Sequence, residues 1–211
     1  MRQSSLLTRC RPEAPEAPAV AALRLCAHAL PDRDRATAAS LLGQSRQGLT
    51  PKQTALAESL VARASAPPAA RTDGLEPIVE MLALAGTKLK WPVIRFEADG
   101  VRYRLGLSGA ASRNPRSVSV TTDERACDAR TYFGRIDPLG VFEPHYKQAA
   151  AGTAIGAALR AFAAAPAEQA RLYGQRFGQC CFCGLELTNK ASIQAGYGPI
   201  CADKYGLPWG D

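Results

Sequence analysis

No long run of apolar residues occurs in this sequence of 211 residues. Its longest hydrophobic stretches are rich in alanine, and none reaches the roughly 18 uncharged apolar residues that a membrane-spanning helix needs. The first residues, MRQSSLLTRCRPEAPEAP, include only a two-leucine apolar patch, far shorter than the apolar region of a secretory signal. These absences predict a soluble protein that stays in a reducing cytoplasm and does not enter a membrane.

Histidine is scarce as well, because the sequence contains only His28 and His145, far apart and in dissimilar surroundings. Catalysis needs converging groups with matched pKa values. We find no Ser/His/Asp or Cys/His set, no nucleotide-binding loop and no paired carboxylates. The sequence therefore predicts a protein that is not an enzyme.

Acidic residues are outnumbered by basic ones, which gives the chain a net charge of +7. The excess lies mainly in residues 1–72, where ten Lys and Arg face five Asp and Glu. A basic balance permits contact with nucleic acid through neutralised phosphates, although many arginine-rich and alanine-rich chains are this basic without such a role. Net charge alone thus leaves nucleic-acid binding open.

Cysteine is present in an unusual pattern. Four of the seven cysteines fall between residues 180 and 201. An odd number of cysteines, clustered at one end of a chain without an export signal, argues against a framework of disulfides. Metal binding or plain burial explains them better.

The sequence also changes character along its length. The stretch CRPEAPEAPA favours extended chain, and ASAPPAARTDG, with two prolines and an Asp-Gly pair, is typical of a linker. Between them, apolar residues recur at helical spacing over 19–29 and 33–47, and Thr50, Pro51 and Gln53 predict a capped helix over 51–64. The expected division is a flexible lead-in at 1–17, a helical N-terminal domain at 18–66, a linker at 67–74, an antiparallel β core with flanking helices at 75–175, and a cysteine module at 176–211.

Period-two alternation predicts the β core. In VIRFEADGVRYRLGL, apolar residues alternate with charged ones on both sides of Asp99-Gly100, which indicates a β-hairpin. Residues 116–122 and 132–144 supply three more short strands, the last two around a turn at Asp-Pro-Leu-Gly. Further helices are expected at 75–84, 146–164 and 166–174, with Gly152 and Gly156 allowing close packing. The predicted fold class is α+β, with a five-strand antiparallel meander or partly open barrel.

The closing segment CCFCGLELTNKASIQAGYGPICADKYGLPWG has the spacing of a metal site. Cys180 and Cys183 form the C-x-x-C pair of a zinc knuckle. Gly184, which follows the second cysteine, reduces the backbone strain of the tight turn. Cys201 follows at the start of a short predicted helix. A knuckle, a hairpin and a helix that supplies ligands make a treble-clef arrangement, so we expect Zn²⁺ bound by Cys180, Cys183 and Cys201.

The fourth ligand of a tetrahedral zinc ion is not obvious. In a treble clef it lies three residues after Cys201, where this sequence has Lys204, which is no zinc ligand at neutral pH. The sources left open are Cys181, Asp203, His28, His145 and a water molecule. The alternative is that no metal binds and that the cysteines are buried like small hydrophobic residues.

This segment resembles a small, uncharacterised cysteine module at the C-terminus of phage and prophage proteins, with the pattern G-x-C-x-x-C-G-x-x-L-T-x-x-x-S-x-x-x-G-x-G-P-x-C-A. The matching positions are Gly178, Cys180, Cys183, Gly184, Leu187, Thr188, Ser192, Gly196, Gly198, Pro199, Cys201 and Ala202. Leu185 stands where the pattern has arginine. Because the pattern itself has only three cysteines, the resemblance implies that the absence of a fourth cysteine is a property of the module. Upstream, LKWPVIRF and YFGRIDPLGVF resemble the sheet of such proteins, so the resemblance covers about half of the chain.

Charged residues on the predicted strands suggest a binding surface. Arginines on one face of a small sheet, with aromatic rings for stacking, are a common way to hold single-stranded nucleic acid. The candidate residues are Arg95, Arg102, Arg104, Arg113, Arg116, Tyr132 and Phe133. The alternative is a solvated face in which Glu97 and Asp99 pair with the arginines.

Taken together, these patterns predict a non-catalytic phage or prophage protein that binds DNA or RNA and carries a structural zinc ion. The alternative function is an adaptor that binds a protein component of host or phage replication, transcription or defence.

Overall fold

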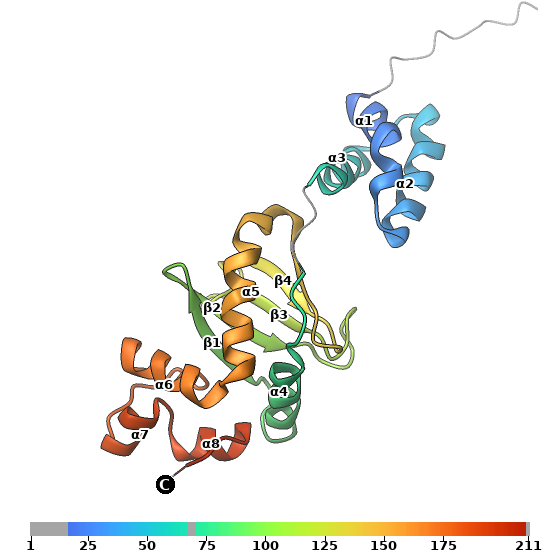
Figure 1. Ribbon diagram of the computed structural model, residues 1–211. Coiled ribbons are helices and arrows are strands. Elements are labelled where there is room, and N and C mark those ends of the chain that lie inside the picture. Colours follow the sequence, from blue (N-terminus) through green and yellow to red (C-terminus); the bar gives the residue numbers. More distant parts are fainter. Residues whose placement is uncertain (1–16, 67–70, 210–211) are drawn as a thin grey trace, which may run out of the picture. The chain divides into compact units, whose positions relative to one another are not determined.

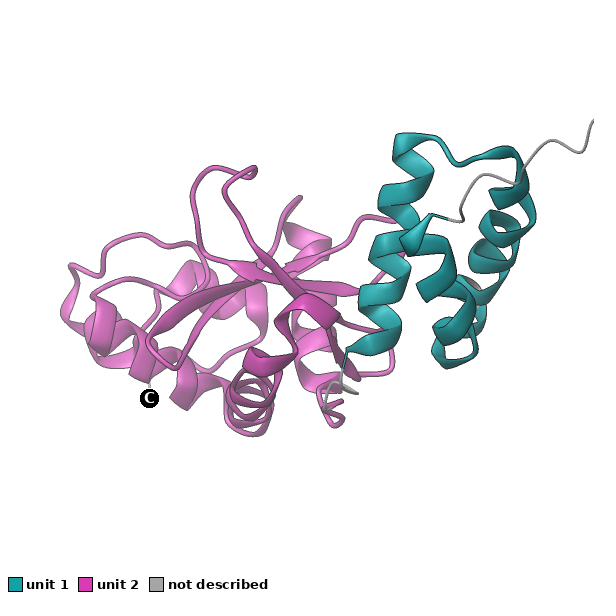
Figure 2. Ribbon diagram, turned by 90° about the horizontal axis from the view of Figure 1, so that it is seen from above, with its two compact units in different colours: residues 1–66 teal, residues 67–211 magenta. Residues whose placement is uncertain are grey.

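The computed structural model describes residues 17–66 and 71–209. All of the predicted lead-in except Ala17, and residues 67–70 of the predicted linker, lie outside the described residues. The chain divides into two compact units, residues 1–66 and 67–211, which Figure 2 colours separately. Each unit has a hydrophobic core of its own. None of the described helices is long and apolar enough to cross a membrane.

Unit 1 is helical, as predicted. Its helices are α1 (Pro18–Cys26), α2 (Asp32–Gln44) and α3 (Pro51–Ser65), with 3₁₀ turns η1 (Ala27–Ala29) and η2 (Ser45–Gln47) after the first two. The predicted capping box begins α3, because the Thr50 hydroxyl accepts the Gln53 N–H at 3.4 Å and the Gln53 side chain accepts the Thr50 N–H at 2.9 Å. Leucines and alanines from all three helices form the core of this unit.

Unit 2 combines a sheet with helices, which confirms the α+β class. Its strands are β1 (Val93–Ala98), β2 (Val101–Leu107), β3 (Val118–Thr122), β4 (Tyr132–Ile136) and β5 (Phe142–Pro144). Its helices are α4 (Glu76–Lys88), α5 (Ala149–Ala164) after the 3₁₀ turn η3 (Tyr146–Gln148), α6 (Pro166–Phe177), α7 (Lys190–Ala195) and α8 (Pro199–Tyr205). The strands pair in the order β1-β2-β3-β4-β5, an antiparallel meander.

The register of the sheet separates two faces. Ile94 lies opposite Leu105, which lies opposite Val120, and these buried residues belong to the core that includes Ile78 of α4 and Ile155 of α5. Figure 1 shows α5 running across the sheet. We call this covered side the inner face. Because side chains alternate along a strand, the residues between these positions point to the other side, which we call the outer face.

Small residues let the helices of unit 2 approach their neighbours closely. A Cβ atom at Gly152 would meet the Pro144 ring at 2.8 Å, and one at Gly156 would collide with the Thr72 hydroxyl, so the predicted close packing is confirmed. Thr72 is buried and exchanges backbone hydrogen bonds with Phe142 of β5. Thr72 is therefore part of the fold of unit 2, although the sequence predicts a linker at this position.

Helices α6 and α7 also approach each other closely through glycine residues. Gly174 of α6 packs directly on the backbone of Gly196, the residue that ends α7, and a side chain at either position would clash. In Figure 1, α6, α7 and α8 lie together at one end of the unit. This end contains the clustered cysteines.

Candidate metal centre and basic sheet face

A tight turn presents the first two cysteines. The Gly184 N–H donates to the Cys180 carbonyl at 2.9 Å, and the Cys180 N–H donates to the Leu185 carbonyl at 2.9 Å. Gly184 has a φ of 73°, a left-handed conformation that glycine adopts without strain. The C-x-x-C pair is thus held by its own backbone, as the sequence predicts.

Cys201 completes a cluster of three thiols. It lies in the first turn of α8, and the Sγ atoms of Cys180, Cys183 and Cys201 all lie within 4.8 Å of one another. Three thiolates bound to one zinc ion at about 2.3 Å are about 3.8 Å apart in a tetrahedral arrangement. Cys180 and Cys201 are buried, whereas Cys183 is exposed. The three cysteines can therefore hold a metal ion with little rearrangement.

The thiols influence each other's ionisation. Hydrogen bonds from Cys180 and Cys201 lower the pKa of Cys183 to about 2, so that Cys183 carries the negative charge. Hydrogen bonding within the cluster raises the pKa of Cys180, mainly through Cys183, and that of Cys201, mainly through Cys180. A metal ion would displace the two shared protons and neutralise the resulting charge.

Cys181 and Asp203 do not join the cluster. Cys181 is buried in the hydrophobic core, and this burial is the main reason that its pKa lies well above the ordinary thiol value. Asp203 is exposed and forms an ion pair with Lys88 at 2.8 Å. Among the described residues, neither Cys181 nor Asp203 belongs to the group of three thiols, so the structure does not bring these two predicted candidates for the fourth ligand to the site.

His145 does not join the cluster either. It packs against the rings of Tyr132 and Tyr146. Within residues 17–66 and 71–209, the cluster contains no donor besides the three cysteines.

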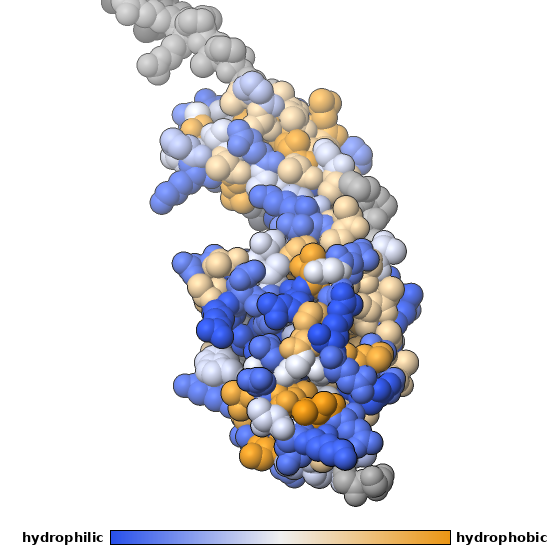
Figure 3. Space-filling model, turned by 90° about the vertical axis from the view of Figure 1, so that its left-hand side faces the viewer, coloured by the Kyte–Doolittle hydropathy of each residue, from blue (hydrophilic) through white to orange (hydrophobic). Residues whose placement is uncertain are grey.

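A cavity of about 560 Å³ borders the cluster. All three cysteines line it, together with Arg95 and Lys204. Three large apolar side chains in its wall are strongly exposed: Trp91 (67%), Leu185 (70%) and Ile200 (68%). In the lower part of Figure 3, hydrophobic residues also lie at the surface among hydrophilic ones. Sequence reasoning missed this cavity, because its wall combines segments that are far apart in the chain.

The segment between the knuckle and α8 differs from the prediction. A hairpin is expected there, but residues 190–195 form the short helix α7. The Asn189 side chain caps it by accepting the Ala191 N–H at 2.9 Å. Asn189 is thus the sequence signal for this helix, and the expected hairpin is wrong.

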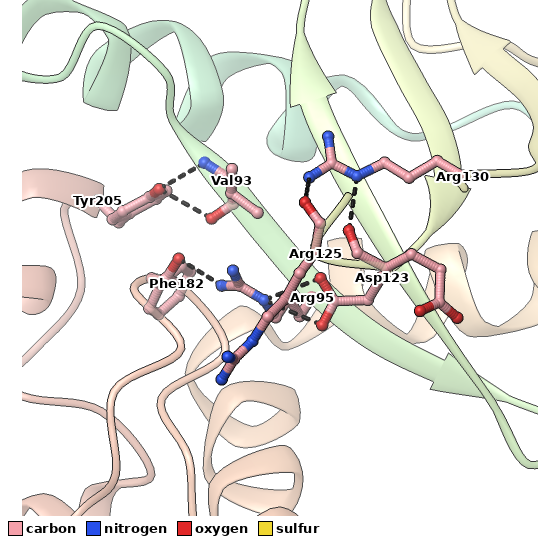
Figure 4. Close-up of polar contacts among 8 residues, drawn as sticks. Val93, Arg95, Asp123, Arg125, Arg130, Phe182 and Tyr205 are labelled. Atoms are coloured by element: carbon pink, nitrogen blue, oxygen red, sulfur yellow. Dashed lines mark hydrogen bonds and ion pairs between the residues drawn. The ribbon is translucent and has the colours of Figure 1, made fainter. Parts of the chain in front are cut away.

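The module is tied to the edge strand β1, as Figure 4 shows. The Arg95 guanidinium donates to the Phe182 carbonyl at 2.8 Å and to both carboxylate oxygens of Asp123 at 3.1 Å. The Arg95 N–H donates to the Cys181 carbonyl at 2.8 Å. The Tyr205 hydroxyl donates to the Val93 carbonyl and accepts the Val93 N–H, both at 2.8 Å. Arg95 therefore links the knuckle to the sheet, which corrects its predicted place on a free binding face.

Replacing Arg95 by methionine should destabilise unit 2. The side chains of Arg95 and Asp123 are only 16% and 13% exposed, so Arg95→Met would leave a buried carboxylate without its cation. We expect the free energy of unfolding to fall by about 3–5 kcal/mol. Urea denaturation followed by circular dichroism measures this decrease.

The matched control is Arg113→Met, because Arg113 lies exposed in the loop between β2 and β3. We expect a change of about 0.5 kcal/mol or less for it. Adding Asp123→Asn to Arg95→Met should recover part of the stability. Equal stability of the two methionine variants would contradict the role of Arg95 as a link between module and sheet.

Arg104 is the most distinctive residue of the outer face. It lies directly opposite Arg95 in β1 and opposite Thr121 in β3, and Thr121 lies opposite Tyr132 in β4. Arg104 is half-buried, and among the described residues its guanidinium forms no hydrogen bond or ion pair. Burial, followed by the positive charges of Arg130 and Arg95, lowers the pKa of Arg104. An anion at this place would relieve that repulsion.

Arg130 is a residue of this face that sequence reasoning missed. It donates to the backbone carbonyls of Glu124 at 2.8 Å and Arg125 at 3.2 Å, as Figure 4 shows, so these contacts leave its charge uncompensated. It comes from the loop between β3 and β4, whose sequence has no periodic pattern. Only the folding of that loop toward β2 brings Arg130 near Arg104.

The other predicted nucleic-acid-binding residues have varied surroundings. Arg102 is exposed, lies opposite Glu97 and has its guanidinium 5.7 Å from the centre of the Phe177 ring. Arg113 and Arg116 are exposed in the loop before β3, and Tyr132 is 42% exposed. Among the described residues, Glu97 forms its ion pair with Arg176 and not with these arginines, with which the alternative interpretation had paired it.

Phe133 corrects the prediction. Its ring packs edge-on against the buried ring of Tyr103, 5.0 Å between centres, and it contacts the hydrophobic core. The register shifts between Val120 and Thr121, which indicates a β-bulge in this region. A bulge reverses the alternation of side chains, so Phe133 is directed to the inner face and cannot stack on a ligand of the outer face.

The end of the chain is similar to a known protein family. Residues 170–206, which hold all three clustered cysteines, match a family of unknown function, DUF6011. Comparisons with curated proteins and with solved structures give no match. The similarity thus covers the cysteine module and carries no assigned activity.

Proposed function

We propose that this is a non-catalytic, cytoplasmic nucleic-acid-binding protein of a phage or prophage, with a structural Zn²⁺ ion in its cysteine module. The observation that carries the proposal is Arg104, a half-buried arginine without a bonded anionic partner among the described residues, next to Arg130. A nucleic-acid phosphate is an anion of suitable size for two such guanidinium groups.

The choice of zinc rests on the donor set. Thiolates select soft or borderline metals, and in a reducing cytoplasm a thiolate-rich site is mostly a structural zinc site. Two hydrogen bonds support a structural role: Arg95 of β1 donates to the Phe182 carbonyl of the knuckle, and Tyr205 of α8 donates to the Val93 carbonyl of β1. A metal ion would hold the knuckle and α8 together next to this edge strand. This cluster contains no histidine or carboxylate among the described residues, which also favours a structural over a catalytic role.

The choice of single-stranded nucleic acid rests on the outer face. Arg102 and Arg104 follow one strand, Arg130 adds a third cation, and Tyr132 offers an exposed ring in register with Thr121. This combination of cations that follow a backbone and a ring on which bases stack is typical of sequence-tolerant binding.

Binding should depend steeply on salt. We expect the full chain to bind a labelled single-stranded oligonucleotide with an affinity that falls linearly on a log–log plot between about 50 and about 300 mM salt. Each neutralised phosphate contributes a slope of about −0.7. Fluorescence anisotropy measures the slope, and DNA and RNA oligonucleotides of equal sequence show which is preferred. Binding that is absent at low salt, or independent of salt, would contradict the proposal.

A second candidate function is an adaptor that binds another protein. The observation in its favour is the group of exposed apolar side chains, Trp91, Leu185 and Ile200, around the cavity of the cysteine module. Arg95 lines this cavity and lies opposite Arg104 in the sheet, so the two candidate surfaces are neighbours in unit 2.

A further inference from the structure

The three thiols of the metal centre differ in their access to solvent. Cys183 is exposed, whereas Cys180 and Cys201 are only 1% and 8% exposed. All three line the cavity of about 560 Å³, which is many times the volume of a small dissolved molecule such as water. Cys183 is therefore the thiol of the cluster that an oxidant in solution reaches most easily.

Two further properties make this thiol sensitive to oxidation. A thiol bound to a metal ion is deprotonated, and thiolates are the nucleophiles that attack peroxides. The Sγ atoms of Cys180 and Cys201 lie within 4.8 Å of the Cys183 Sγ, so a second thiol that can close a disulfide stands next to it. Cys127 is exposed as well, but it lies outside the cluster. Exposure and a neighbouring thiolate are thus combined at Cys183.

The backbone indicates which neighbour closes the disulfide. Cys180 and Cys183 lie on one turn, which is closed by the hydrogen bond from the Gly184 N–H to the Cys180 carbonyl. A disulfide needs its sulfur atoms to approach to about 2.05 Å, which a shift of this turn alone can provide. Cys201 stands on α8, and both α8 and the knuckle are bonded to β1. A bond from Cys183 to Cys201 would require these two segments to move against each other, so Cys180 is the favoured partner.

We infer that Cys183 is a modification site for hydroperoxides, where oxidation starts the formation of a Cys180–Cys183 disulfide and thereby releases the metal ion. This regulation rests on the proposed zinc site. It is independent of nucleic-acid binding on the outer face.

The reaction takes two steps. The Cys183 thiolate attacks the terminal oxygen of the hydroperoxide, and the O–O bond breaks. Cys183 becomes a sulfenic acid, and the remaining oxygen of the peroxide takes up a proton to give an alcohol or water. The Cys180 thiolate then attacks the sulfenic sulfur, so that the S–S bond forms and hydroxide leaves, which is protonated to water. Two electrons pass from the two thiolates to the peroxide, and the metal ion loses two of its three cysteine ligands.

The test treats the zinc-loaded full chain with hydrogen peroxide in an amount equal to the chain. A colorimetric zinc indicator follows the release of metal, and mass spectrometry of alkylated peptides identifies the oxidised cysteines. We expect zinc release equal in amount to the Cys180–Cys183 disulfide, with Cys201 left as a free thiol. Cys183 should be oxidised at least about tenfold faster than Cys127 in the same molecules, because most of an ordinary exposed thiol is protonated near pH 7. A dithiol reductant with added zinc should restore the metal content.

The matched control is Cys127→Ser, which removes an exposed thiol but keeps all three ligands. Its zinc should leave at the rate of the wild type, and slower release would overturn the inference. Zinc that stays bound under peroxide would also overturn it, as would a disulfide that joins Cys183 to Cys201 or to a cysteine outside the cluster. Wild-type protein that binds no zinc before treatment would instead refute the metal site itself.

Discussion

Removal of the metal ion is expected to lower the thermal unfolding midpoint of unit 2 by about 10 °C or more. Structural zinc contributes about 10–16 kcal/mol to the folding of small isolated zinc modules, and part of that stabilisation should appear here. The physical reason is that Cys180 and Cys201 come from separate segments, each tied to β1 through Arg95 or Tyr205. Without the ion, these segments keep weak thiol contacts and the packing of the Phe182 ring on the Tyr205 ring, 4.2 Å between centres.

Calorimetry of zinc-loaded and chelator-treated protein measures this shift, together with zinc content before and after treatment. Cys201→Ser should reproduce the effect of chelation, because it removes a ligand that no neighbouring donor replaces among the described residues. Cys127→Ser is the matched control, since Cys127 is exposed and outside the cluster. Wild-type protein that contains zinc in equal amount to the chain but keeps its midpoint on chelation would contradict a structural role.

Reversal of charge on the outer face should have the second large effect. We expect Arg104→Glu combined with Arg130→Glu to weaken the binding of single-stranded oligonucleotide by about 100-fold or more at low salt. The variant lacks two cations that would neutralise phosphates, and its two new carboxylates repel the nucleic-acid backbone. The salt dependence of any remaining binding should become shallower by about 0.7 for each phosphate that is no longer neutralised.

The control must carry the same change in net charge. Arg160→Glu combined with Lys52→Glu meets this condition, because Arg160 lies on α5, which covers the inner face, and Lys52 is exposed in unit 1. We expect this control to bind within about threefold of the wild type. If both double variants bind equally well, the outer face is not the binding surface, and net charge alone accounts for the affinity.

Local features of the structure were predictable because their causes lie within a few residues. The capping box at Thr50 and Gln53 depends on hydrogen bonds across one helical turn. The hairpin at Asp99-Gly100 depends on two adjacent residues that tolerate positive φ, here 48° and 77°. The C-x-x-C turn depends on Gly184 and the backbone around it. In each case the side chains that form the feature are neighbours in the chain, so their spacing alone indicated the conformation.

The amino-acid sequence therefore specified the α+β class, the strand alternation and the three clustered cysteines. Only the tertiary structure decided which arginine side chains are held by contacts within the protein. Arg95, for example, contacts Phe182, which is 87 residues away in the sequence, and Asp123, which is 28 residues away. It also showed that Arg104 is half-buried with no hydrogen bond or ion pair among the described residues, and that Cys181 and Asp203 lie outside the group of three thiols. Such outcomes depend on the packing of distant segments, whose relative positions no local pattern encodes.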